Sequence, residues 1–133
     1  MLYLADVEEG LVTRCCTFRL DPNGFVRATM HDGATFDLND ARDAIAATWQ
    51  IAGERRLPVL VDMRGVRAQT REAREYFMSE DAAAKLRAVA LVAASPIAKV
   101  LGNFFIHIGE HKIPTQIFTD RDSAEAWLRE HLA

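Results

Sequence analysis

The sequence has few of the features that mark secreted or membrane proteins. Its only two cysteines, Cys15 and Cys16, are adjacent, and neighbours on a strand point to opposite faces, so no disulfide between them is expected. No apolar run approaches the ~18 residues of a membrane span, and no basic leader precedes an apolar stretch at the N-terminus. These absences predict reduced thiols, no membrane insertion and a cytoplasmic location.

An excess of basic residues is also missing. The chain carries 16 Lys and Arg against 19 Asp and Glu, a formal net charge of −3. Nucleic-acid-binding domains usually carry an excess of base, so nucleic acid is not an expected partner. With 133 residues, 50% of them hydrophobic, the chain is long enough for one core, which predicts a single domain over residues 1–133.

The first third of the chain has the composition of short strands joined by turns. Residues 11–19 are rich in β-branched side chains, and residues 2–7 and 25–30 are expected to form neighbouring strands. The run Asp21-Pro22-Asn23-Gly24 favours a turn, because proline presets φ and Asn or Gly accepts a positive φ. We therefore expect antiparallel strands in this region.

Farther along, helical segments alternate with apolar strands. Apolar positions from Ala41 to Ala52 recur at helical spacing, with Asp37 or Asn39 as the N-cap and Gly53 at the end. Residues 57–62 and 88–93 are continuous apolar runs, typical of central strands covered on both faces. Further helices are expected after the capping residues Thr70, Ser79, Ser95 and Thr119 or Asp120, the last of them following a strand at 114–118.

The predicted order is β-β-β-α-β-α-β-α-β-α. Helices that alternate with apolar strands indicate parallel strand pairs, whereas strands joined by short turns pair antiparallel. The sequence thus predicts an α/β fold with a mixed, mostly parallel sheet, antiparallel N-terminal strands at one edge, and about four helices packed on it.

This order and several local runs resemble the STAS-like, or SpoIIAA-like, superfamily, and within it a group of uncharacterised bacterial proteins. The similar runs are VLVDMRG at 59–65, TREAREYF at 70–77, AVALV at 88–92 with SP at 95–96, LGNFF at 101–105, and PTQIFTD at 114–120 followed by Ala124, Trp127 and Leu128. The likeness covers most of the chain from about Leu11 onward. It implies a SpoIIAA-like fold and a non-enzymatic regulatory or protein-interaction module whose partner is another protein or a second copy of the chain.

The best-known members of that superfamily are switched by phosphorylation of a serine at the start of the helix after the central strand. The family motif there is similar to Asp-Ser-Ser-Gly, whereas this chain has AQTRE at 68–72, without the Asp-Ser pair or the glycine. Thr70 is the nearest matching hydroxyl. It has two interpretations, a plain helix N-cap or a phospho-acceptor beside arginines.

A candidate site lies beyond the carboxyl ends of the parallel strands, where open α/β sheets usually bind ligands. Arginines beside helix N-termini are suited to hold a phosphate or carboxylate. We predict that an anion, or an acidic or phosphorylated partner, binds at this strand-end rim, which consists of Arg64, Arg67, Thr70, Arg71 and Ser95. The alternative is that the arginines form a solvated face, paired in part with Glu72 and Glu75.

Three other features of the sequence bear on its function. Asp62 lies at a strand end, but no histidine or nucleophile stands beside it in sequence, so an enzyme is not expected. His107 and His111 have a zinc-binding spacing, but Gly109 interrupts the helix and no third ligand is evident, so no metal or other cofactor is expected. An apolar pocket beside a helix over residues 96–106, near Phe104 and Phe105, would instead suit a small molecule or lipid.

Overall fold

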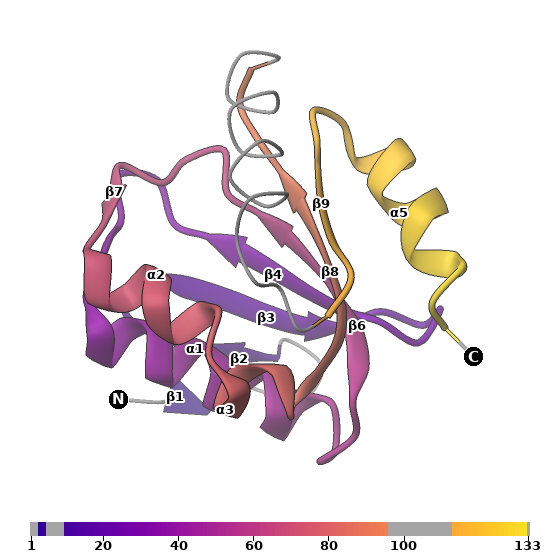
Figure 1. Ribbon diagram of the computed structural model, residues 1–133, viewed down its shortest axis with the longest axis horizontal. Helices are drawn as coiled ribbons and strands as arrows, with labels where there is room; N and C mark the ends of the chain where they lie inside the picture. Colours follow the sequence, from indigo (N-terminus) through magenta and orange to yellow (C-terminus); the bar gives the residue numbers. More distant parts are fainter. Residues whose placement is uncertain (1–2, 5–9, 96–112, 133) are drawn as a thin grey trace.

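The chain folds as a mixed β-sheet with helices on both faces (Figure 1). The computed structural model describes residues 3–4, 10–95 and 113–132. The strands of the main sheet are, in spatial order, β1 (Tyr3–Leu4), β2 (Leu11–Val12), β3 (Cys16–Leu20), β4 (Val26–Met30), β6 (Leu57–Asp62), β8 (Leu86–Val92) and β9 (Thr115–Phe118). The helix expected over 96–106, with Phe104 and Phe105, and both His107 and His111 lie outside the described residues.

The strand directions confirm the predicted fold class. Strands β1 to β4 pair antiparallel, whereas β4, β6, β8 and β9 pair parallel. Asp62 at the end of β6 is level with Val92 at the end of β8. The connections that follow these two strands therefore start at the same edge of the sheet.

The helices begin where local side chains can accept backbone hydrogen bonds. Helix α1 (Leu38–Ile51) has Asp37 as its N-cap, α2 (Arg71–Phe77) has Thr70, α3 (Glu80–Ala83) has Ser79, and α5 (Arg121–Arg129) has Asp120. Each of these caps was among those predicted. Within the described residues, no helix has the length and apolar character needed to cross a bilayer.

The two faces of the sheet are covered by different helices. On one face, the small side chains Ala88 and Ala90 of β8 pack with Ala124 and Leu128 of α5. On the other, β3 and β4 pack against α1, so α5 and α1 lie on opposite sides of the sheet (Figure 1). The alternation of buried and half-buried side chains along β8 follows from this.

Two details of the fold differ from the sequence prediction. Residues 11–19 do not form one strand, because the Thr13 hydroxyl accepts a hydrogen bond from the Cys16 amide at 3.1 Å and turns the chain into a hairpin of β2 and β3. A second, two-stranded parallel sheet of β5 (Thr35–Phe36) and β7 (Ala68–Gln69) was not predicted. The pairing of β5 with β7 links the connection after β6 to the segment that precedes α1.

Candidate functional site

An apolar cavity of ≈270 Å³ lies between the sheet and helices α1, α2 and α3. The sheet contributes Phe18, Ala28, Val61, Val89, Leu91 and Ile117 to its wall, and the helices contribute Ile45, Phe77 and Ala83. Val61, Val89 and Leu91 are only half-buried, although each lies on a central strand of the sheet. The described residues therefore leave the face opposite α5 incompletely filled.

Most polar atoms in this wall are already satisfied by neighbouring backbone. The hydroxyl of Thr48 donates to the Ala44 carbonyl at 2.8 Å, and that of Ser79 donates to the Tyr76 carbonyl at 2.6 Å. Thr115 donates to the Ile113 carbonyl at 3.2 Å. These groups offer little unused polar capacity, so the wall presents mainly hydrocarbon to the cavity.

Methionines are concentrated around the cavity. Three of the four methionines of the chain, Met30, Met63 and Met78, line it. The unbranched, polarisable methionine side chain adapts to irregular shapes and is frequent at surfaces that accept varied apolar ligands. Sequence reasoning missed this grouping because the three residues lie far apart in the chain.

The cysteine that faces the cavity is chemically inert. Cys16 is 1% exposed, and burial raises the pKa of its thiol to about 12. Cys15 is also buried, so neither thiol lies on an open side of the sheet. A thiol that stays protonated at neutral pH behaves as a small apolar group, and Cys16 therefore extends the apolar wall.

One end of the cavity is polar. Gln69, in β7, and Arg74, in α2, both contribute to its wall, and Nη1 of Arg74 donates to the backbone carbonyl of Gln69 at 2.7 Å. Among the described lining residues, Arg74 is the one that carries a charge. The described part of the cavity wall thus combines an apolar interior with a single cationic group.

The arginines of the strand-end rim have partners of their own. Arg64 binds Asp62 with two hydrogen bonds, Nε to Oδ1 at 3.0 Å and Nη2 to Oδ2 at 2.7 Å. Arg71 binds Glu75 one turn along α2, with Nε 2.9 Å from Oε1. Carboxylates thus neutralise the charges of two of the three arginines predicted to form the rim.

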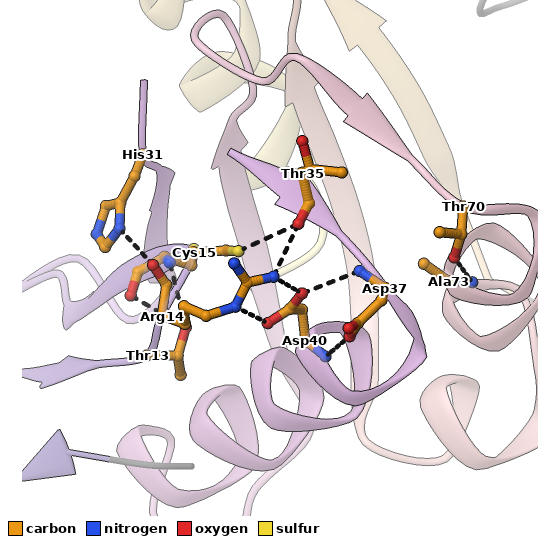
Figure 2. Close-up of polar contacts among 10 residues, drawn as sticks. Thr13, Arg14, Cys15, His31, Thr35, Asp37, Asp40, Thr70 and Ala73 are labelled. Atoms are coloured by element: carbon orange, nitrogen blue, oxygen red, sulfur yellow. Dashed lines mark hydrogen bonds and ion pairs between the residues drawn. The ribbon is translucent and has the colours of Figure 1, made fainter. Parts of the chain in front are cut away.

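The other predicted rim residues lie on the same edge of the sheet. Arg67 is exposed, and its backbone amide donates to the Ala34 carbonyl at 2.9 Å. The Thr70 hydroxyl accepts from the Ala73 amide at 3.1 Å, as an N-cap (Figure 2). Ser95 is half-buried shortly beyond the end of β8. The binding of an anion at this rim stays a prediction.

Asp62 is held in its ionised form. The hydrogen bonds from Arg64 lower the pKa of Asp62 and outweigh the opposing effect of partial burial. A carboxyl group with a lowered pKa is a poor general acid at neutral pH. Within residues 10–95 and 113–132, no three His, Cys, Asp or Glu side chains gather closely enough to hold a metal ion.

An ion pair between the exposed Arg14 and the buried Asp40 joins the β2–β3 hairpin to α1 (Figure 2). Asp40 is 6% exposed and accepts from Nε of Arg14 at 2.9 Å, with a second contact from Nη2 to its other oxygen. Asp40 also accepts from the Asp37 amide at 2.9 Å, while Asp37 accepts from the Asp40 amide. Burial alone would raise the pKa of Asp40, but the Arg14 and Asp37 hydrogen bonds lower it.

This ion pair has a structural role. Nη2 of Arg14 also donates to the Thr35 carbonyl at 3.0 Å, so the guanidinium connects the hairpin, β5 and the first turn of α1. Sequence analysis missed it, although two aspartates three residues apart at a helix start form the pattern of a reciprocal cap.

Comparison with known families and structures agrees with this fold. Residues 18–132 match the model of a family described as "Domain of unknown function (DUF7793)". The chain belongs to the DUF7793 family. No curated protein matches the DUF7793 chain.

Solved structures give the fold of this DUF7793 chain. It is similar to an uncharacterised DUF3478-family protein with a SpoIIAA-like fold from Shewanella loihica PV-4, with a TM-score of 0.58, 13% identity, and coverage of 85% of this chain and 91% of that one. A protein of unknown function from Arthrobacter sp. FB24 is 26% identical over 95% of this chain and 96% of that one, but its TM-score of 0.34 is too low to support an argument. The predicted SpoIIAA-like fold is thus confirmed.

Proposed function

We propose that this protein is a non-enzymatic STAS-like regulatory module that binds a small apolar molecule in the cavity between the sheet and helices α1 to α3. The proposal rests on the cavity itself, ≈270 Å³ of space with a wall of aliphatic, aromatic and methionine side chains. Ligand sites are typically concave and mostly apolar, with a few polar groups that fix orientation. The cavity has this composition.

The position of the cavity favours a regulatory role. Met63 and Gln69 line it, and both belong to the connection between β6 and α2 that also carries the exposed Arg64 and Arg67. A ligand that contacts Met63 or Gln69 would bias the conformation of this connection. Ligand binding in the cavity would thereby change how well the rim binds an acidic or phosphorylated protein.

Catalysis is not favoured by the same geometry. The described residues of the cavity wall include no Asp, Glu or His, so they offer neither a general acid nor a general base. Asp62 is engaged by Arg64, and its pKa is lowered. The groups around the cavity are suited to bind a ligand rather than to transform it.

Calorimetric titration with 1-octanol tests the proposal. We expect saturable binding at one site with a negative heat-capacity change, because apolar surface leaves water. The substitution Val61→Phe places a ring in the cavity and should abolish binding. The control Leu20→Phe adds similar bulk at a side chain that is 44% exposed and outside the cavity, and it should leave binding unchanged.

Two results would oppose the proposal. One is that neither 1-octanol nor octanoate binds the wild-type protein. The other is that Val61→Phe, shown to be folded by circular dichroism, binds 1-octanol as well as the wild type does.

A further inference from the structure

We infer that the ligand of the cavity is an apolar monocarboxylate, whose carboxylate binds Arg74 beside Gln69 and whose hydrocarbon body fills the space against the sheet. This inference rests on the proposed function and specifies its ligand. It follows from the charge of the wall, from the way Arg74 is held, and from the size of the cavity.

Among the described arginines, Arg74 is the one that lines the cavity, and its side chain is also exposed to solvent. Arg14, Arg27, Arg64 and Arg71 each form an ion pair with a carboxylate. In the part of the chain that the structure describes, no carboxylate forms such a pair with Arg74. The described residues therefore leave its positive charge without a carboxylate partner beside an apolar cavity.

The polar end of the cavity is held in place by backbone contacts. Arg74 uses Nη1 for the Gln69 carbonyl at 2.7 Å, and a guanidinium has further N–H groups that can bind a carboxylate with two hydrogen bonds. Gln69 is fixed by the pairing of β7 with β5, where it lies opposite Phe36. Its side-chain amide can add a third donor to the same anion.

The size and polarity of the remaining wall limit the rest of the ligand. The ≈270 Å³ of the cavity lies just below the ~300–1,000 Å³ typical of small-molecule sites, which favours a small ligand. A second charge on the ligand would meet hydrocarbon and remain unpaired, which is costly. A single carboxylate on a short aliphatic or aromatic body fits these limits, whereas a nucleotide or a dicarboxylate does not.

Octanoate and 1-octanol test this inference because they share a hydrocarbon body and differ in charge. We expect the wild-type protein to bind octanoate more tightly than 1-octanol. Arg74→Gln should weaken octanoate about tenfold, the usual worth of a charge-assisted hydrogen bond, and should change the affinity for 1-octanol by less than about twofold. The control is Arg129→Gln, an exposed arginine of α5 outside the cavity wall and outside the strand-end rim; it should change neither.

Salt provides a second measurement that needs no variant. Octanoate affinity for the wild-type protein should fall as NaCl is raised, because salt screens the Arg74 charge, and 1-octanol affinity should not fall. Equal binding of the two probes, or an equal loss of octanoate affinity in Arg129→Gln and Arg74→Gln, would overturn the inference but leave the proposed function standing. Failure of both probes to bind the wild-type protein would overturn both.

Discussion

At the scale of single residues, Gly10 meets a tighter constraint than the turn glycines. Its φ is +87°, and a Cβ at this position would lie 1.8 Å from the backbone oxygen of Phe18. Gly33 has a similar φ of +74° but no atom within 4 Å of the same position. A side chain at Gly33 would thus meet backbone strain alone, whereas a side chain at Gly10 would meet both strain and a steric clash.

Alanine substitutions test this difference. We expect Gly33→Ala to lower the free energy of unfolding by about 1 kcal/mol, from the positive φ alone. Gly10→Ala should cost at least about 2 kcal/mol more, since β3 must move to admit the methyl group. Urea titrations followed by circular dichroism measure both values, and equal losses would show that the Phe18 contact is unimportant.

The two cysteines provide a second test at this scale. Burial raises the pKa of Cys16 to about 12 and also raises the pKa of Cys15, with a further contribution from Asp40. Both thiols should thus be protonated and shielded at pH 8. A water-soluble thiol reagent should label neither cysteine in the native protein and both in urea, as counted by mass spectrometry. Rapid native labelling would contradict the burial of these side chains.

At the scale of elements, α1 is anchored at its start rather than along its length alone. Asp40 joins Arg14 of the hairpin to the reciprocal cap with Asp37. The short parallel sheet of β5 and β7 begins beside this anchor and holds the connection after β6. The positions of the strand-end rim and of the polar end of the cavity therefore depend on the hydrogen bonds of Arg14, Asp37 and Asp40 near the start of α1.

The Asp40→Asn substitution tests this anchor through its pH dependence. The pKa of Asp40 lies below its ordinary value of 3.8, so the ionised form stabilises the fold above that pH, and this stabilisation is lost as the pH falls through the lowered pKa. At pH 7 we expect a loss of about 1–2 kcal/mol. The difference from wild type should shrink as the pH falls below 3.8.

The control for this experiment is Glu72→Gln. Glu72 is an exposed carboxylate in the first turn of α2. It should show no comparable change in stability when urea titrations are repeated from pH 7 to pH 3. A pH-independent loss in Asp40→Asn would mean that its charge does not contribute to the anchor.

At the scale of the whole molecule, the two faces of the sheet are packed to different degrees. Ala90 is fully buried on the α5 side, whereas the next residue of β8, Leu91, is half-buried in the cavity wall. Added volume should thus be tolerated on one face and not on the other. This expectation follows from the cavity itself and does not depend on whether a ligand binds there.

Adjacent substitutions in β8 test this asymmetry. Leu91→Phe should change the free energy of unfolding by less than about 0.5 kcal/mol, because the ring can occupy empty space. Ala90→Leu should lower it by about 1–3 kcal/mol, the usual cost of overpacking a filled core. Urea titrations of both variants measure these changes. Equal destabilisation would indicate that the Leu91 face is as filled as the other.

Much of the fold could be predicted because its signals are local. The helix caps Asp37, Thr70, Ser79 and Asp120 need only the next few residues to act, and the apolar runs of β6 and β8 are contiguous. Their parallel pairing followed from the helices between them. The two-residue strands β5 and β7 could not be predicted, since each is stabilised by a segment remote in the chain. The hairpin at Thr13 was missed because the β-branched residues on both sides of it favour one continuous strand.

The candidate site divides in the same way. The sequence alone was sufficient to place Arg64, Arg67, Thr70 and Ser95 at one edge of a parallel sheet, because chain order and strand direction determine which connections share an edge. Tertiary packing was needed to bring Arg74 of α2 to the same cavity wall as Leu91 of β8, and to leave that face of the sheet incompletely filled by the described residues. Such features depend on distances between residues remote in the chain, on which local patterns carry no information.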